Sequence, residues 1–151
     1  MTDDQSRPST KQARLVYSGE GLVFTGRWSE RQDSITFDSD GLTGPSPMDA
    51  LLMSLAACMA VDVRMILEKS RVTVNALTVD ASGKRRESEP RRFTSITLDY
   101  RLDGPSGEDG AKVERAIQLS RDKYCSVLHT LDPDLDVKIT VGGSDPSPVR
   151  R

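Results

Sequence analysis

The segment DALLMSLAACMAVDVRMIL, residues 49–67, most constrains what this chain can fold into. From Ala50 to Val63 its residues are apolar on almost every face of a helix, and the pattern then turns polar at Arg64, Glu68 and Lys69. A helix that is apolar all round is buried all round. We therefore expect a long central helix that is covered by a sheet on one side and by a partner chain on the other.

The residues just before this segment predict where the helix starts. Ser46 can cap it, and Pro47 fits the first helical position. Asp49 follows Ser46 by three residues, which predicts a capping box with Asp in place of the usual Glu or Gln.

Membrane and nucleic-acid functions are not expected. The apolar run from Ala50 to Val63 is too short to span a bilayer, and Asp49 and Asp62 lie at its ends. The first residues, MTDDQSRPSTKQ, lack the apolar stretch of a signal peptide. The net charge of −2 gives no basic field for nucleic acid. We expect a cytoplasmic protein, in which thiols are reduced by default and a disulfide is transient and catalytic.

The rest of the chain predicts an α+β domain with the element order βββ-α-ββ-α-β. Residues 1–12 and 142–151 read as disordered tails around a single domain at 13–141. Alternating apolar residues, bounded by turn residues, indicate the strands. A second helix is expected at about 109–123, and a short third one in CSVLHTL. The expected strands are ARLVYS, GLVFTGRW, SITFD, RVTVNALTVDASG, RFTSITLDYRL and LDVKITV.

Two cysteines and one histidine carry most of the possible chemistry. Cys125 and His129 are four residues apart, so with Cys58 and a carboxylate they could form a zinc site. The same Cys–His pair could act in hydrolysis, although no orienting third group is evident. Thiol redox chemistry needs only two cysteines and a cation that stabilises a thiolate. Spacing leaves open which cysteine would attack. Cys58 lies in apolar surroundings and reads as an ordinary buried core residue, whereas Cys125 is better placed locally, at a possible helix start.

Two segments resemble the OsmC/Ohr family of osmotically inducible and organic-hydroperoxide-resistance proteins. They are GPSPMDALLMSLAACMAVDV and KVERAIQLSRDKYCSVLHTL. In the first, a turn of small residues leads into an apolar helix with Cys58 near its middle. In the second, Cys125 follows an amphipathic helix. The resemblance extends from about residue 13 to residue 141 and is strongest for the branch with a GPSPM[DE] signature.

This resemblance implies a fold and an activity. The fold would be an OsmC-like intertwined homodimer, with long central helices sandwiched by antiparallel sheets. The activity would be the reduction of organic hydroperoxides and, less well, of hydrogen peroxide. Cys58 matches the family's peroxide-attacking cysteine and Cys125 its resolving cysteine, so the cycle would pass through a Cys58 sulfenic acid and a Cys58–Cys125 disulfide. The reductant would be a dithiol such as a lipoylated protein, with no metal or organic cofactor.

The resemblance also implies an Arg that pairs with the thiolate and with a Glu at the start of the helix. In this chain, Arg27 and Arg31 of GRWSER are the candidates for that Arg. Met48 stands where the family has Glu, and the acid comes one residue later, as Asp49. This departure motivates an alternative function. In it, a non-peroxidase OsmC-like dimer binds a small hydrophobic or sulfur-containing ligand in the pocket at its interface.

Overall fold

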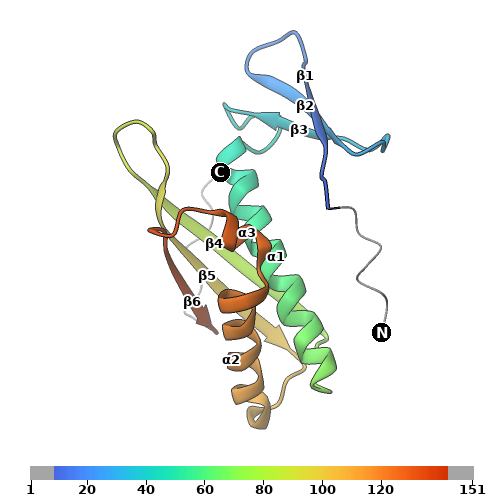
Figure 1. Ribbon diagram of the computed structural model, residues 1–151, viewed down its shortest axis with the longest axis vertical. Helices are drawn as coiled ribbons and strands as arrows, with labels where there is room; N and C mark the ends of the chain where they lie inside the picture. The colour runs from blue at the N-terminus through green and yellow to red at the C-terminus, as the bar shows by residue number, and fades with distance from the viewer. Residues whose placement is uncertain (1–8, 143–151) are drawn as a thin grey trace. The chain divides into compact units, whose positions relative to one another are not determined.

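The computed structural model of the chain describes residues 9–142 (Figure 1). The chain divides into two compact units, Met1–Ala50 and Leu51–Arg151, which are described separately below. The observed order of strands and long helices confirms the predicted α+β succession. The single domain at 13–141 stays a prediction, and the predicted tails lie mostly outside the described residues.

The first unit contains a three-stranded antiparallel sheet, and its apolar side chains are poorly covered. Its strands are β1 (Ala13–Tyr17), β2 (Val23–Trp28) and β3 (Ile35–Asp38), in the order β1-β2-β3. Among residues 9–50, none of the apolar side chains is fully buried in the single chain. A small sheet without a buried face is not stable by itself, so this unit needs a covering surface.

Asp38 at the end of β3 organises the loop that leads to the long helix. Its carboxylate accepts hydrogen bonds from the backbone N–H groups of Asp40, Leu42 and Thr43 and from the Thr43 hydroxyl. These bonds, above all that from Asp40, lower the pKa of Asp38. The carboxylate thus fixes the turn from which the helix departs.

Helix α1 (Pro47–Lys69) starts with the predicted cap. The Asp49 carboxylate accepts from the Ser46 backbone N–H at 3.0 Å and from its hydroxyl at 2.6 Å, and the Asp49 N–H donates to Ser46 Oγ at 3.2 Å. The capping box is therefore confirmed, with Asp in the Glu position. By length and composition α1 could cross a membrane, contrary to the prediction from its shorter apolar run, but buried core helices share this property.

Within one chain, α1 buries a stripe rather than its whole circumference. Residues at four-residue spacing are fully buried: Leu55, Met59, Val63 and Leu67. On other faces Met53, Val61 and Met65 are 53, 56 and 46% exposed. The chain itself therefore supplies only part of the cover that an all-round apolar helix requires.

The second unit contains the other three-stranded sheet, formed by β4 (Ala76–Arg85), β5 (Phe93–Asp103) and β6 (Asp136–Val141). β4 and β5 form an antiparallel hairpin, whereas β6 joins β5 in parallel. The sheet therefore departs from a purely antiparallel arrangement. Alternate side chains of β5 are buried, namely Ile96, Leu98 and Tyr100. They form the core with the buried stripe of α1 and with α2, which lies alongside α1 (Figure 1).

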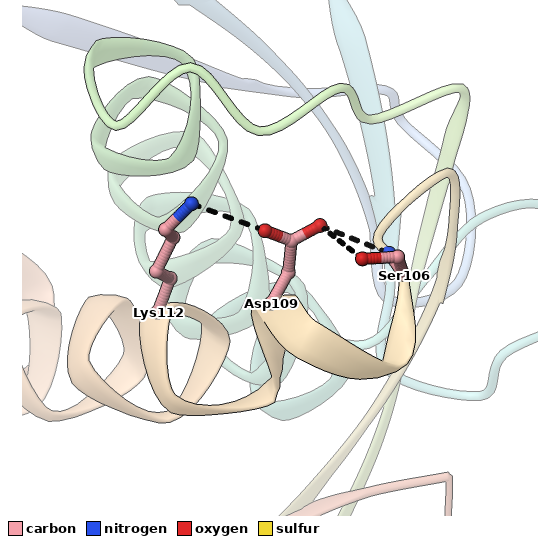
Figure 2. A network of polar contacts seen from close by, with 3 residues as sticks. All are labelled: Ser106, Asp109 and Lys112. Atoms are coloured by element: carbon pink, nitrogen blue, oxygen red, sulfur yellow. Dashed lines mark hydrogen bonds and ion pairs between the residues drawn. The ribbon is translucent and has the colours of Figure 1, made fainter.

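The segment predicted as one helix at 109–123 has two parts. It is α-helical in α2 (Gly110–Leu119) and then widens into a π-helical turn at Ser120–Tyr124, before the short helix α3 (Ser126–Thr130). Figure 2 shows the start of α2, where Asp109 accepts from Ser106 and pairs with Lys112 at 3.2 Å. The bond from the Ser106 backbone and the contact with Lys112 lower the pKa of Asp109.

Candidate active site

The structure brings the two cysteines together with a carboxylate. The sulfur atoms of Cys58 and Cys125 and a carboxylate oxygen of Asp62 all lie within 4.8 Å of one another. Cys58 and Asp62 are one helical turn apart on α1, and so share a face. Both are partly buried, whereas Cys125 is fully buried. A disulfide bond measures about 2.05 Å, so the two sulfur atoms would have to approach by less than about 3 Å to form one.

The π-helical turn ties Cys125 to α1. The Ser120 hydroxyl donates to Asp62 Oδ2 at 2.8 Å, and Ser120 is fully buried. The backbone N–H of Cys125 donates to the Ser120 carbonyl oxygen at 2.8 Å, a bond that spans five residues. Such wide turns often occur at functional sites, where they re-aim side chains. Here the turn brings the Ser120 hydroxyl to the Asp62 carboxylate. It also places Cys125 close to both of these residues.

Tyr100 on β5 completes the cluster. Its side chain is fully buried, and its hydroxyl has no hydrogen-bond partner within the part of the chain that the structure describes. Burial raises the pKa of the Tyr100 hydroxyl, and the neighbouring Cys125, Asp62 and Cys58 raise it further. Tyr100 therefore remains a neutral phenol beside three groups that can each carry a negative charge.

The two thiols differ in their surroundings. Burial is the largest cause that raises the pKa of Cys125 to about 11. The N–H of Leu128, which donates to the Cys125 sulfur at 3.4 Å, acts in the opposite direction, but Cys58 and Asp62 add to the effect of burial. Cys125 is thus a protonated, inaccessible thiol at neutral pH, and Cys58 is the thiol that a small molecule can reach.

His129 does not belong to this cluster. It is exposed, and its Nε2 lies 3.1 Å from the carbonyl oxygen of Arg121. A carbonyl oxygen only accepts, so Nε2 carries the proton in this contact. The zinc site considered from the sequence combined His129 with both cysteines and a carboxylate, whereas the group of possible ligand atoms in the described chain contains the two cysteines and Asp62 without His129. Asp62 supplies the carboxylate that this set required.

Arg27 and Arg31 lie in the first unit, and their relation to Cys58 stays a prediction. Both side chains are exposed and line the same surface hollow. Arg31 donates through Nε and Nη2 to the Asp33 carboxylate, at 3.0 and 2.8 Å. Arg27 forms no ion pair among residues 9–142. Asp49 serves as the helix cap described above, and a catalytic role for it also stays a prediction.

Three members of the cluster were not predicted from the sequence, namely Asp62, Ser120 and Tyr100. Each could have been noticed in the sequence, because each is a polar residue at a position where the local pattern calls for an apolar one. Asp62 interrupts an apolar helix four residues after Cys58, and Ser120 and Tyr100 fall on the buried faces of their elements. Buried polar groups are usually satisfied by one another, which would have linked them.

Comparisons with known proteins place the chain in a family. The sequence profile of the OsmC-like protein family matches residues 38–140. Protein YhfA from Escherichia coli K12 is 38% identical over 126 residues, which cover 83% of this chain and 92% of YhfA.

Solved structures agree with this match. A hypothetical protein from Aquifex aeolicus is 32% identical, with a TM-score of 0.77 over 89% of this chain and 96% of that one. The organic hydroperoxide resistance protein OhrB of Bacillus subtilis shares the fold, with a TM-score of 0.60, 15% identity and coverage of 87% and 97%. The profile match, the relatives and the strand order all lead to one conclusion: the chain belongs to the OsmC-like family.

Proposed function

We propose that this protein is a thiol-dependent peroxidase that reduces organic hydroperoxides, and hydrogen peroxide less well. The observation that carries the proposal is the approach of the Cys58 and Cys125 sulfur atoms to within 4.8 Å. A relative in fold bears the name organic hydroperoxide resistance protein, which supports the same activity here.

The different burial of the two thiols supports their division of roles. Cys58 is partly exposed, so its thiolate attacks an oxygen of the hydroperoxide. The O–O bond breaks and Cys58 becomes a sulfenic acid, while the departing alkoxide takes up the proton that the Cys58 thiol released on ionisation and leaves as the alcohol. Cys125 is buried and protonated, so it does not compete for peroxide.

In the second step Cys125 loses its proton and its sulfur attacks the sulfur of Cys58. The S–S bond forms and hydroxide leaves, taking up the proton as water. Asp62 lies within 4.8 Å of both sulfur atoms and can relay this proton. A dithiol such as a lipoylated protein then reduces the disulfide, and the reducing cytoplasm is the compartment in which we expect this cycle.

The proposed enzyme is a homodimer. In a single chain the first unit buries none of its apolar side chains among residues 9–50, and α1 exposes Met53, Val61 and Met65. A partner chain would cover these surfaces, and the family resemblance implies the same assembly. Sedimentation of the wild type and of Met65→Asp tests this point, because a charge on a buried apolar face should dissociate the dimer.

The testing experiment is a stopped-flow reaction of the reduced protein with cumene hydroperoxide, in EDTA, with Cys58→Ser and Cys125→Ser measured alongside. We expect the wild type to lose two thiols rapidly and Cys125→Ser to accumulate a sulfenic acid that dimedone traps at Cys58. Slow oxidation in all three proteins, at the rate of a free thiol of pKa about 8.5, would refute the peroxidase proposal and favour the ligand-binding alternative.

A second pair of variants distinguishes the roles of Arg27 and Arg31. Arg31 already pairs with Asp33, so we expect Arg27 to stabilise the Cys58 thiolate. Arg27→Gln should therefore slow sulfenic acid formation, with Arg31→Gln as its matched control. Equal rates in Arg27→Gln and the wild type would exclude Arg27 from this role.

A further inference from the structure

We propose that the reduced protein binds one thiophilic divalent cation per chain, such as Zn²⁺, through Cys58, Asp62 and Cys125. The three ligand atoms come from α1 and from the residue that precedes α3, and all lie within 4.8 Å of one another. This site goes beyond the proposed peroxidase and does not depend on it.

The chemistry of the three ligands suits zinc. Two thiolates and one carboxylate are ligands that zinc prefers, and three protein ligands leave a fourth position open to water. Zn–S bonds of about 2.3 Å and Zn–O bonds of about 2.1 Å put tetrahedral ligand atoms roughly 3.6–3.8 Å apart. Each pair in this structure therefore has to close by at most about 1 Å, which small side-chain rotations supply.

The electrostatics also favour a cation. Asp62 forms no ion pair among residues 9–142, and its hydrogen-bond partner there is the neutral Ser120 hydroxyl. Deprotonating either thiol would put a second negative charge beside this carboxylate in a partly buried place, which is costly without a countercharge. A divalent ion provides that countercharge.

The residues around the three ligands also suit a metal site. Ser120 is fully buried and holds the Asp62 carboxylate, as the outer partners of metal ligands commonly do. The fully buried Tyr100 hydroxyl has no hydrogen-bond partner in the described chain and lies near all three ligands. Once the cation is bound, this hydroxyl can donate to a ligand thiolate or to the bound water. A cavity of about 330 Å³, which Asp62 and Tyr124 help to line, lies next to one of the three ligands.

The test is a titration of the reduced, metal-free full chain with Zn²⁺ against a chromophoric chelator, repeated with Co²⁺. We expect one Zn²⁺ per chain, and with Co²⁺ a thiolate-to-metal charge-transfer band together with the visible bands of tetrahedral cobalt. Asp62→Asn should weaken Zn²⁺ binding by at least about tenfold. Cys58→Ser and Cys125→Ser should each remove the strong site.

Two matched controls make the result specific. Asp122→Asn changes an exposed carboxylate of the same π-helical turn, and His129→Ala removes the histidine of the site considered from sequence. Both should bind Zn²⁺ like the wild type. Diamide, which takes two electrons and two protons from the thiols as the S–S bond forms, should abolish binding.

Wild-type affinity in Asp62→Asn, or no stoichiometric binding to the reduced wild type, would overturn this proposal. Neither outcome affects the peroxidase test, which is performed in EDTA. Conversely, if the protein shows no peroxidase activity but binds Zn²⁺ in this pattern, the metal-site proposal is still supported.

Discussion

Replacing Tyr100 by Phe should stabilise the protein. The Tyr100 side chain is fully buried, and no hydrogen-bond partner of its hydroxyl lies in the described part of the chain. A buried polar group without a partner costs about 1–3 kcal/mol of desolvation. Phe keeps the ring and its packing and removes only the oxygen, so most of this penalty should be recovered.

We expect the free energy of unfolding of Tyr100→Phe to rise by about 1–2 kcal/mol. For a chain of this size, each kcal/mol raises Tm by roughly 2–4 °C. The assay is urea unfolding of the reduced protein in EDTA, at equal protein concentrations because any dimerisation would couple to unfolding. The m-value should stay unchanged, which would show that only stability has altered.

Tyr124→Phe is the matched control. Tyr124 is 48% exposed, so its hydroxyl is hydrated in both folded and unfolded chains, and its loss should change stability by no more than about 0.5 kcal/mol. A Tyr100→Phe variant that is less stable than the wild type by 1 kcal/mol or more would refute the reasoning, because the hydroxyl would then have a partner that stabilises the fold.

Three other changes probe the stability of the fold. Met59→Ala, in the fully buried stripe of α1, should lower the free energy of unfolding by about 2–5 kcal/mol in urea titrations. Ser46→Ala removes the cap that bonds Asp49 and should cost about 0.5–2 kcal/mol in the same assay. The lowered pKa of Asp38 means that its carboxylate stabilises the fold above pH 3.8, and that this contribution is lost as the pH falls through the lower folded-state value. Asp38→Asn should therefore be less stable than the wild type at pH 7, and the difference should shrink by pH 3; a constant difference would contradict this origin.

The elements of this fold could be predicted because their signals are local. The alternation of Ile96, Leu98 and Tyr100 marks one face of a strand within a few residues, and Ser46 with Asp49 marks the helix start. The parallel pairing of β6 with β5 was not predicted, because strand direction in a sheet depends on the connection through α2 and α3 rather than on either strand. The π-helical turn at Ser120–Tyr124 was missed for a similar reason, since its side chains suit an ordinary helix.

The meeting of Cys58 with Cys125 was expected from the family resemblance, but spacing did not indicate it. Asp62 lies 58 residues from its partner Ser120, and no periodic pattern carries information over that separation. The useful local observation was a carboxylate, Asp62, within an apolar helix. A partly buried carboxylate needs a hydrogen-bond partner, and this need points to the other buried polar residues.

The roles proposed for the two cysteines rest on two opposing effects on a thiolate, whose balance could not be judged from the sequence. From the sequence, Cys125 at a helix start was the better candidate for a thiolate, because backbone N–H groups there favour negative charge. The structure contains this feature, since the Leu128 N–H reaches the Cys125 sulfur. Yet the pKa of Cys125 is raised to about 11, because burial outweighs one long N–H···S contact and Asp62 opposes a second negative charge. A helix start activates a thiol only where solvent or a cation also supports the charge. This difference in burial supports Cys58 as the attacking thiol of the proposed peroxidase, and a cation bound at this cluster would stabilise the thiolate form of both sulfur atoms at once.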